Sequence, residues 1–219
     1  MRGLLYTTFF VSSFLFLTQC NKKACDCGPA TKDPGNTVSK LSYGDSVRYL
    51  KNTDYTISPL NGKTGTYTAY PDNLKMDRST GKITVAVYGT DGASQTGMWY
   101  KINYRSNTSN EVDSTYFLIS GITYVDKFYH LSQNDSIVYP YYNGNPSNAI
   151  PSGNYDLQHD SKFAINPSNG QININECARR GFFSGQTTGW IKAPIKYSVN
   201  DNSNGAINAI DLVIYYYNT

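Results

Sequence analysis

The chain has 219 residues, enough for one large domain or for two domains of roughly 100 residues each. Its 19 basic and 16 acidic residues leave a net charge of +3, a balance that lacks the electrostatic footprint of a nucleic-acid-binding protein. The 20 tyrosines suit half-buried strands and the 18 glycines suit turns, while helical periodicity is nearly absent beyond the N-terminus. We therefore expect an all-β protein.

The first predicted element is an export signal over residues 1–19. Arg2 precedes an apolar run, residues 4–17, which is too short and wrongly flanked for a membrane-spanning helix. The run ends in Leu-Thr-Gln-Cys, which resembles the lipobox of bacterial, Bacteroidota-type lipoproteins, although Gln19 replaces the usual Gly, Ala or Ser. The resemblance implies that Cys20 carries lipid and anchors the protein at the outer membrane or cell surface. The alternative is an ordinary signal peptide with a chance cysteine.

Residues 20–37 have no periodicity and are rich in Pro, Gly and polar residues, so we interpret them as a flexible tether. The tether contains Cys25 and Cys27, and the remaining cysteine is Cys177. A C-x-C pair with distant histidines is a poor metal site. A disulfide from the tether to Cys177 and a lone buried Cys177 both remain open.

One short pattern occurs twice in the rest of the chain. Residues 73–85 and 162–174 each contain an alternating apolar run, a four-residue turn closing on Gly81 or Gly170, and a second alternating run. This pattern predicts a β-hairpin in which the glycine supplies the positive φ of the turn. We interpret both glycines as structural turn residues.

Further matches follow in the same order. Leu, Ser, Asp, Ser and Tyr recur between residues 40–49 and 130–139, and Gly-Thr-Tyr at 65–67 matches Gly-Asn-Tyr at 153–155. Offsets that stay near 90 residues indicate tandem duplication. We predict two immunoglobulin-like β-sandwich domains, at 38–124 and 125–219.

The two hairpins also carry a family resemblance. Leu-Lys-Met-Asp-Arg-Ser-Thr-Gly-Lys-Ile-Thr-Val and Phe-Ala-Ile-Asn-Pro-Ser-Asn-Gly-Gln-Ile-Asn-Ile resemble the turn signature of Ig-like and cadherin-like repeats of bacterial surface proteins. The resemblance implies a β-sandwich fold and a role in adhesion, but no particular ligand. Cadherin-type calcium sites need clustered carboxylates at the junction, where Asp126 stands nearly alone. We predict no metal or other cofactor, and calcium binding remains open.

The sequence offers little for catalysis. His130 and His159 occupy different contexts, neither lies beside a nucleophile motif, and the acidic residues are scattered through polar turns. We expect no enzymatic activity. Trp99 and Trp190 align between the repeats, and we interpret both as core residues.

Two loops are the candidate ligand sites, because loops at the ends of sandwiches often carry recognition. One loop combines two arginines with two phenylalanines, and the other is rich in tyrosine; the residues are Arg179, Arg180, Phe182 and Phe183 in the first and Tyr141 and Tyr142 in the second. These side chains suit stacking on sugars or capture of an acidic partner. The alternative is that Phe182 and Phe183 extend a strand and cap the core, with the arginines in solvent.

Two functional hypotheses follow. In the first, the chain is a non-enzymatic surface lipoprotein whose Ig-like domains mediate adhesion or protein–protein interaction. In the second, it is an auxiliary lipoprotein that holds polysaccharide for an uptake system. Its partners are therefore a membrane through the lipid anchor and surface proteins or polysaccharide, with no nucleic acid.

Overall fold

The structure is a computed structural model that describes residues 40–89, 94–125, 128–130, 137–185 and 188–217. The predicted signal peptide, Cys20, and the tether with Cys25 and Cys27 lie outside the described residues. Within the described ranges, no helix is long and apolar enough to cross a membrane.

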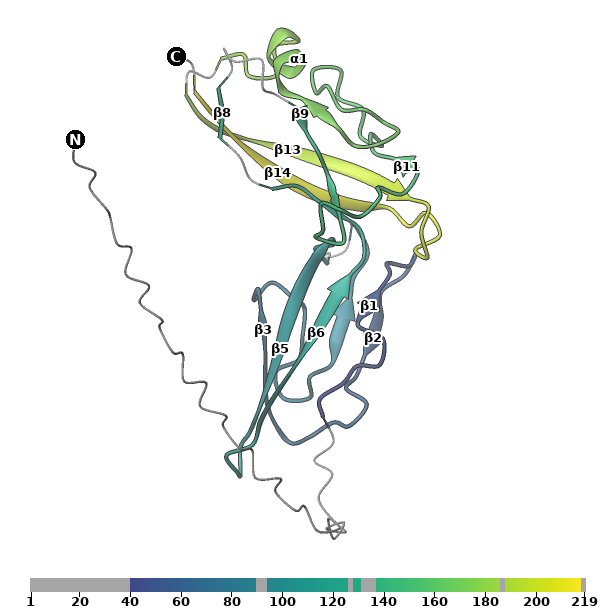
Figure 1. The fold of residues 1–219 in the computed structure, drawn as a ribbon, viewed down its shortest axis with the longest axis vertical. Coiled ribbons are helices and arrows are strands. Elements are labelled where there is room, and N and C mark those ends of the chain that lie inside the picture. Colours follow the sequence, from purple (N-terminus) through teal and green to yellow (C-terminus); the bar gives the residue numbers. More distant parts are fainter. Residues whose placement is uncertain (1–39, 90–93, 126–127, 131–136, 186–187, 218–219) are drawn as a thin grey trace, which may run out of the picture. The chain divides into compact units, whose positions relative to one another are not determined.

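The first repeat contains one large and one small sheet (Figure 1). Its strands are β1 (Val47–Arg48), β2 (Tyr55–Ile57), β3 (Gly65–Tyr70), β4 (Ile83–Val85), β5 (Met98–Ser106) and β6 (Val112–Ile119). The large sheet has the order β1-β6-β5-β3, in which β1 runs parallel to β6 and the other neighbours are antiparallel. Strands β2 and β4 pair as the small sheet.

The second repeat follows the same topology. Its elements are β7 (Ile122–Thr123), β8 (Phe128–His130), β9 (Ile137–Val138), β10 (Tyr141–Tyr142), β11 (Gly153–Asn154), β12 (Ile172–Asn173), α1 (Ile174–Arg179), β13 (Thr188–Val199) and β14 (Asn208–Tyr217). The large sheet has the order β8-β14-β13-β11, with β8 parallel to β14, and β9 pairs with β12. Strand β10 adds a pair with β7.

Each repeat has its own hydrophobic core. Side chains alternate between the two faces of a strand, and one face supplies the core. On strand β5, Tyr100, Ile102 and Tyr104 are buried, while the residues between them are not. In the first core these side chains pack with Tyr67 and Phe117. The second core combines the corresponding strands of its own repeat with Ile174 and Cys177 of α1 and with Phe183. The predicted all-β chain with two immunoglobulin-like β-sandwiches is confirmed.

Both predicted turns are present. The first hairpin is closed by a Met76–Ile83 bridge and the second by an Ile165–Ile172 bridge. Gly81 and Gly170 each have φ of 71°, a conformation that side chains with a Cβ rarely adopt. The Oδ1 atom of Asp77 accepts hydrogen bonds from the backbone N–H groups of Ser79 and Thr80, and Asn166 accepts one from Ser168. These side chains close the turns, as the sequence predicts.

The interpretation of Trp99 and Trp190 as core residues is wrong. Their exposed fractions are 44% and 57%. Strand alternation is the reason, because Tyr100 takes the inward position on β5 and Trp99 therefore points outward. Alignment between two repeats identifies equivalent positions, but an exposed position can be duplicated as readily as a buried one.

The segment after the second hairpin is a helix, so the expectation that it extends a strand is also wrong. The side chain of Asn173 accepts a hydrogen bond from the backbone N–H of Glu176 and caps α1. Ile174 and Cys177, three residues apart, are the buried side of that turn. The Cys177 thiol is free and fully buried, and burial raises its pKa to about 11. It therefore behaves as a core residue.

Candidate functional site

The arginines of the first predicted loop are paired with an acidic residue of α1. Arg179 and Arg180 both bind Glu176: the Nε atom of Arg179 lies 2.6 Å from Oε2, and the Nε atom of Arg180 lies 2.9 Å from Oε1. These hydrogen bonds lower the pKa of Glu176 to about 2. The two positive charges thus share an internal carboxylate, which weakens them as a site for an acidic partner.

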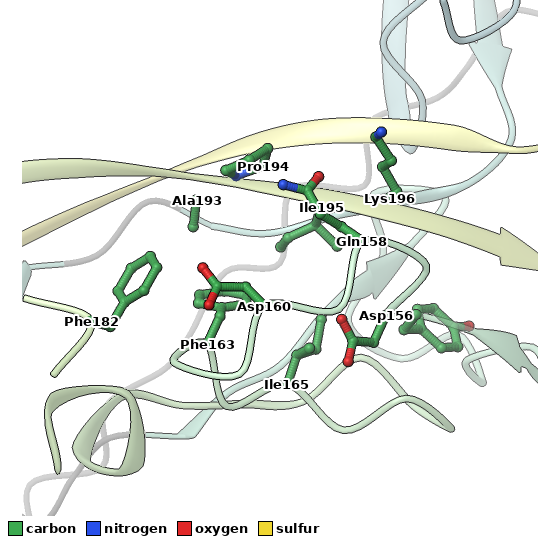
Figure 2. A pocket seen from close by; sticks show the side chains of 11 residues that line it. Asp156, Gln158, Asp160, Phe163, Ile165, Phe182, Ala193, Pro194, Ile195 and Lys196 are labelled. Atoms are coloured by element: carbon green, nitrogen blue, oxygen red, sulfur yellow. The ribbon is translucent and has the colours of Figure 1, made fainter. Parts of the chain in front are cut away.

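The two phenylalanines of that loop pack inward, away from the arginines. Phe183 is buried in the second core, where its ring centroid lies 4.6 Å from that of Tyr216. Phe182 is half-buried against Phe163 and faces a small cleft (Figure 2). The expectation that they cap the core therefore holds, and the four residues do not form one recognition surface.

The cleft of Figure 2 brings Phe182 together with Asp156, Asp160 and Lys196. Its room for a water-sized group is only about 20 Å³. Both carboxylates serve local turns: Asp156 accepts from the backbone N–H of His159, and Asp160 accepts from that of Lys162. The cleft is therefore too small for a substrate, and its carboxylates are structural.

Tyr141 and Tyr142 face different surroundings on β10. The hydroxyl of Tyr142 donates to Asp201 at 2.8 Å and lies 2.9 Å from the hydroxyl of Ser120, and burial raises its pKa to about 12. Tyr141 lines a shallow groove beside Tyr139 and Pro146. Only Tyr141 of the predicted pair therefore remains open to a partner.

A larger open surface lies on the outer side of the first repeat's large sheet, and we call it the outer face. It consists of the outward-pointing residues of β3, β5 and β6: Thr66, Thr68, Tyr70, Trp99, Lys101, Asn103, Arg105, Val112, Ser114 and Tyr116. A groove of about 690 Å³, open to solvent, runs over much of this surface.

The register of the strands orders the outer face into rows. In one row, Tyr70 pairs with Lys101, which pairs with Tyr116 on the other side. The exposed fractions of the two tyrosines are 75% and 59%. Trp99 lies two residues from Lys101 on the same strand. Three exposed aromatic side chains therefore surround one lysine.

The next rows are polar. Thr68, Asn103 and Ser114 pair across the three strands, followed by Thr66, Arg105 and Val112. These side chains supply hydroxyl, amide and guanidinium groups along the groove.

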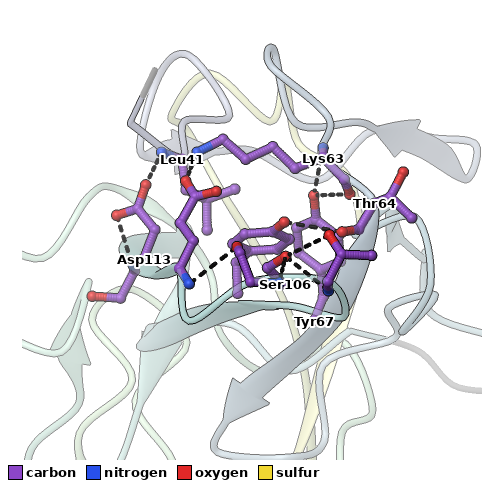
Figure 3. Close-up of polar contacts among 11 residues, drawn as sticks. Leu41, Lys63, Thr64, Tyr67, Ser106 and Asp113 are labelled. Atoms are coloured by element: carbon purple, nitrogen blue, oxygen red, sulfur yellow. Dashed lines mark hydrogen bonds and ion pairs between the residues drawn. The ribbon is translucent and has the colours of Figure 1, made fainter. Parts of the chain in front are cut away.

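Two acidic side chains lie at the groove, and Figure 3 shows the contacts of Asp113, which is part of its lining. Glu111 forms an ion pair with Lys63, and Asp113 accepts from the backbone N–H of Leu41. Among the described residues, neither Lys101 nor Arg105 has an ion-pair partner. The outer face therefore presents two cations that lack an ion pair, while the carboxylate of Asp113 also lines its groove.

The corresponding face of the second repeat differs. Trp190 is exposed and pairs in register with Tyr215, so an aromatic pair is present there too. Lys192, however, forms an ion pair with Asp211 at 3.8 Å. Duplication thus preserved an exposed tryptophan on the equivalent strand, while the neighbouring lysine has an ion-pair partner in the second copy.

Sequence reasoning missed the outer face, although the signal was present. Residues 99–105 alternate strictly between outward polar or aromatic residues and inward Tyr100, Ile102 and Tyr104. If the alternation is extended to Trp99, it predicts that this side chain lies on the outer side of the sheet, as Lys101 does. Among the described residues, no group of His, Cys, Asp and Glu could hold a metal ion.

No protein-family model matches the chain, and no curated protein sequence matches it either. The chain is similar to solved structures of Drosophila N-cadherin EC1-3 (12% identity, TM-score 0.29), mouse cadherin-23 EC22-24 (14%, 0.26) and human protocadherin-24 EC1-2 (8%, 0.25). The alignments cover 84%, 78% and 82% of this chain and 66%, 62% and 98% of those chains. The chain thus spans less than two thirds of the first two. The assignment of the fold rests on the sheets and cores described above.

Proposed function

We propose that the chain is a non-enzymatic, surface-displayed binding protein that mediates adhesion through the outer face of its first repeat. The observation that carries the proposal is the exposure of Tyr70, Trp99 and Tyr116 on one side of one sheet. Tyr, Trp and Arg are the residues enriched at protein interfaces and at their energetic centres. A large exposed aromatic patch is costly in a monomer and marks an interaction surface.

A surface protein partner and a polysaccharide both suit this kind of face. Protein–protein interaction follows from the composition of the patch. Polysaccharide holding is favoured by a specific observation, namely that Lys101, which pairs in register with Tyr70 and Tyr116, lines an open groove that also carries hydroxyl and amide groups. Both fit a protein that binds without catalysing a reaction.

Adhesion can be measured with beads that carry the full-length chain, applied to a layer of cells of the producing organism. We expect the double variant Tyr70→Ala/Tyr116→Ala to lose bead retention by about tenfold, as for removal of central interface residues. Tyr139→Ala is the matched control, since Tyr139 is 56% exposed outside this face. Equal retention of all three proteins would refute the proposed role of the face.

Display at the surface depends on the lipid that we propose for Cys20. Two or more acyl chains hold a protein on a membrane firmly, whereas a single chain does so only marginally. We expect intact-mass analysis to show acylated protein in the membrane fraction, and the Cys20→Ala variant to lose the added mass and leave that fraction. If Cys20→Ala stays in the membrane fraction, another feature anchors the chain.

A further inference from the structure

We infer that the outer face binds an acidic polysaccharide, a chain of sugar rings bearing carboxylate groups. This inference rests on the proposed function, because it names the class of partner for the same surface. It is carried by the combination of three features along strand β5: exposed aromatic rings, cations without an ion pair to any described residue, and a groove lined with small polar side chains.

The spacing of the aromatic rings suits a polymer of sugars. Tyr70 and Tyr116 flank Lys101 in direct register, so their backbones lie two strand spacings, or roughly 10 Å, apart. Trp99 lies a further two residues along β5, roughly 7 Å from Lys101. The apolar side of a sugar ring packs well on an aromatic ring, and rings at this spacing can each receive a different sugar of one extended chain.

The groove gives the sugar chain a path away from the aromatic rings. From Trp99 to Arg105, strand β5 covers roughly 20 Å. Along this path Thr68, Asn103 and Ser114 form the central polar row. Sugar hydroxyls both donate and accept hydrogen bonds, and so do these hydroxyl and amide groups. An open groove also admits a polymer at any point along its length, whereas a closed pocket accepts only an end.

Charge sets the preference for an acidic polymer. Lys101 stands among the aromatic rings and Arg105 stands at the far end of the groove, and neither forms an ion pair with a described residue. Of the neighbouring acids, Glu111 forms an ion pair with Lys63, whereas Asp113 accepts from the backbone N–H of Leu41 and keeps its negative charge beside the groove. A carboxylate-bearing sugar chain would supply ion-pair partners for Lys101 and Arg105. The guanidinium of Arg105 can bind a carboxylate through two parallel hydrogen bonds.

The second repeat provides an internal comparison. It has the exposed Trp190 on the equivalent strand, but its Lys192 is paired with Asp211. Its aromatic set is also smaller, with Trp190 and Tyr215 in place of Tyr70, Trp99 and Tyr116. Of the two equivalent lysines beside an exposed tryptophan, Lys101 lacks an ion pair with any described residue whereas Lys192 has one, so we assign the site to the first repeat.

The test uses the full-length chain and polygalacturonate, with fully methyl-esterified polygalacturonate as the uncharged polymer of the same sugar. Binding is measured by affinity electrophoresis. We expect Tyr116→Ala and Lys101→Gln each to weaken binding to polygalacturonate by about tenfold. Tyr139→Ala and Lys192→Gln are the matched controls, and both should bind as the wild type does. The ester should bind the wild type more weakly than the acid, and circular dichroism confirms that each variant is folded.

Three results would overturn the inference. The first is absence of binding to polygalacturonate by the wild type. The second is equal binding of the acid and its ester, which removes the role of charge. The third is binding of poly-L-glutamate that depends on Lys101 but not on Tyr116, which identifies an acidic peptide as the partner class. If any of these occurs while bead retention still depends on Tyr70 and Tyr116, the proposed adhesion stands and only the ligand class is wrong.

Discussion

Replacing Gly170 with alanine is expected to lower the free energy of unfolding by about 2–5 kcal/mol, and Gly81→Ala should have an effect of similar size. Each glycine has φ of 71°, which costs a residue with a Cβ about 1–2 kcal/mol. Each also touches a core tyrosine: a Cβ on Gly81 would lie 2.7 Å from the ring of Tyr67, and one on Gly170 would lie 2.9 Å from that of Tyr155. The buried rings cannot move aside without opening their own core.

The carbonyl groups of the same glycines also prevent the backbone from moving to make room for a Cβ. The hydroxyl of Tyr43 donates to the carbonyl oxygen of Gly81 at 2.6 Å, and that of Tyr124 donates to the carbonyl oxygen of Gly170 at 2.7 Å. Moving the backbone to relieve a clash therefore breaks a buried hydrogen bond.

Chemical denaturation measures both glycine variants. The matched control is Gly62→Ala, because a Cβ on Gly62 meets nothing within 4 Å. That change should be neutral or slightly stabilising. If Gly81→Ala and Gly170→Ala unfold at the same denaturant concentration as Gly62→Ala, the two turns do not have the role assigned to them.

Tyr197→Phe is expected to destabilise the protein by about 2–3 kcal/mol, because the change leaves buried polar groups without partners. The Tyr197 hydroxyl accepts from the backbone N–H of Ile122 at 3.1 Å and from the side-chain amide of Asn208 at 2.8 Å. With both acceptor positions used, its proton is donated to the hydroxyl of Thr96, 2.6 Å away. A phenyl ring fills the same space but leaves the Ile122 N–H unpaired.

The matched control for this prediction is Tyr116→Phe. Tyr116 is 59% exposed, so water replaces any contact that its hydroxyl loses, and the change should stay within about 0.5 kcal/mol of the wild type. Equal stability of Tyr197→Phe and Tyr116→Phe would show that the buried hydroxyl contributes nothing.

The duplicated architecture was predictable because each repeat contains the same local signals. The matched Gly-x-Tyr segments and the later matched tyrosines meet in space as equivalent ring pairs, Tyr67 with Tyr104 and Tyr155 with Tyr197. Turn residues such as Asp77 and Asn166 act within a few positions of the chain, so their effect can be read from the sequence.

The candidate site was less predictable, since it depends on pairing between strands far apart in the sequence. Tyr70, Lys101 and Tyr116 become neighbours only through the register of β3, β5 and β6. Local composition pointed instead to the Arg179–Phe183 segment. There, both arginines donate hydrogen bonds to the carboxylate of Glu176, and the helix directs Cys177 and Ile174 into the core.

The most direct test of the proposed function is the retention of chain-coated beads by cells, compared between Tyr70→Ala/Tyr116→Ala and Tyr139→Ala. Both variants remove exposed tyrosines, but only the first removes them from the outer face. We predict about a tenfold loss of retention for the double variant and no loss for Tyr139→Ala. Retention of the folded double variant at the level of the wild type would contradict the assignment of binding to the outer face.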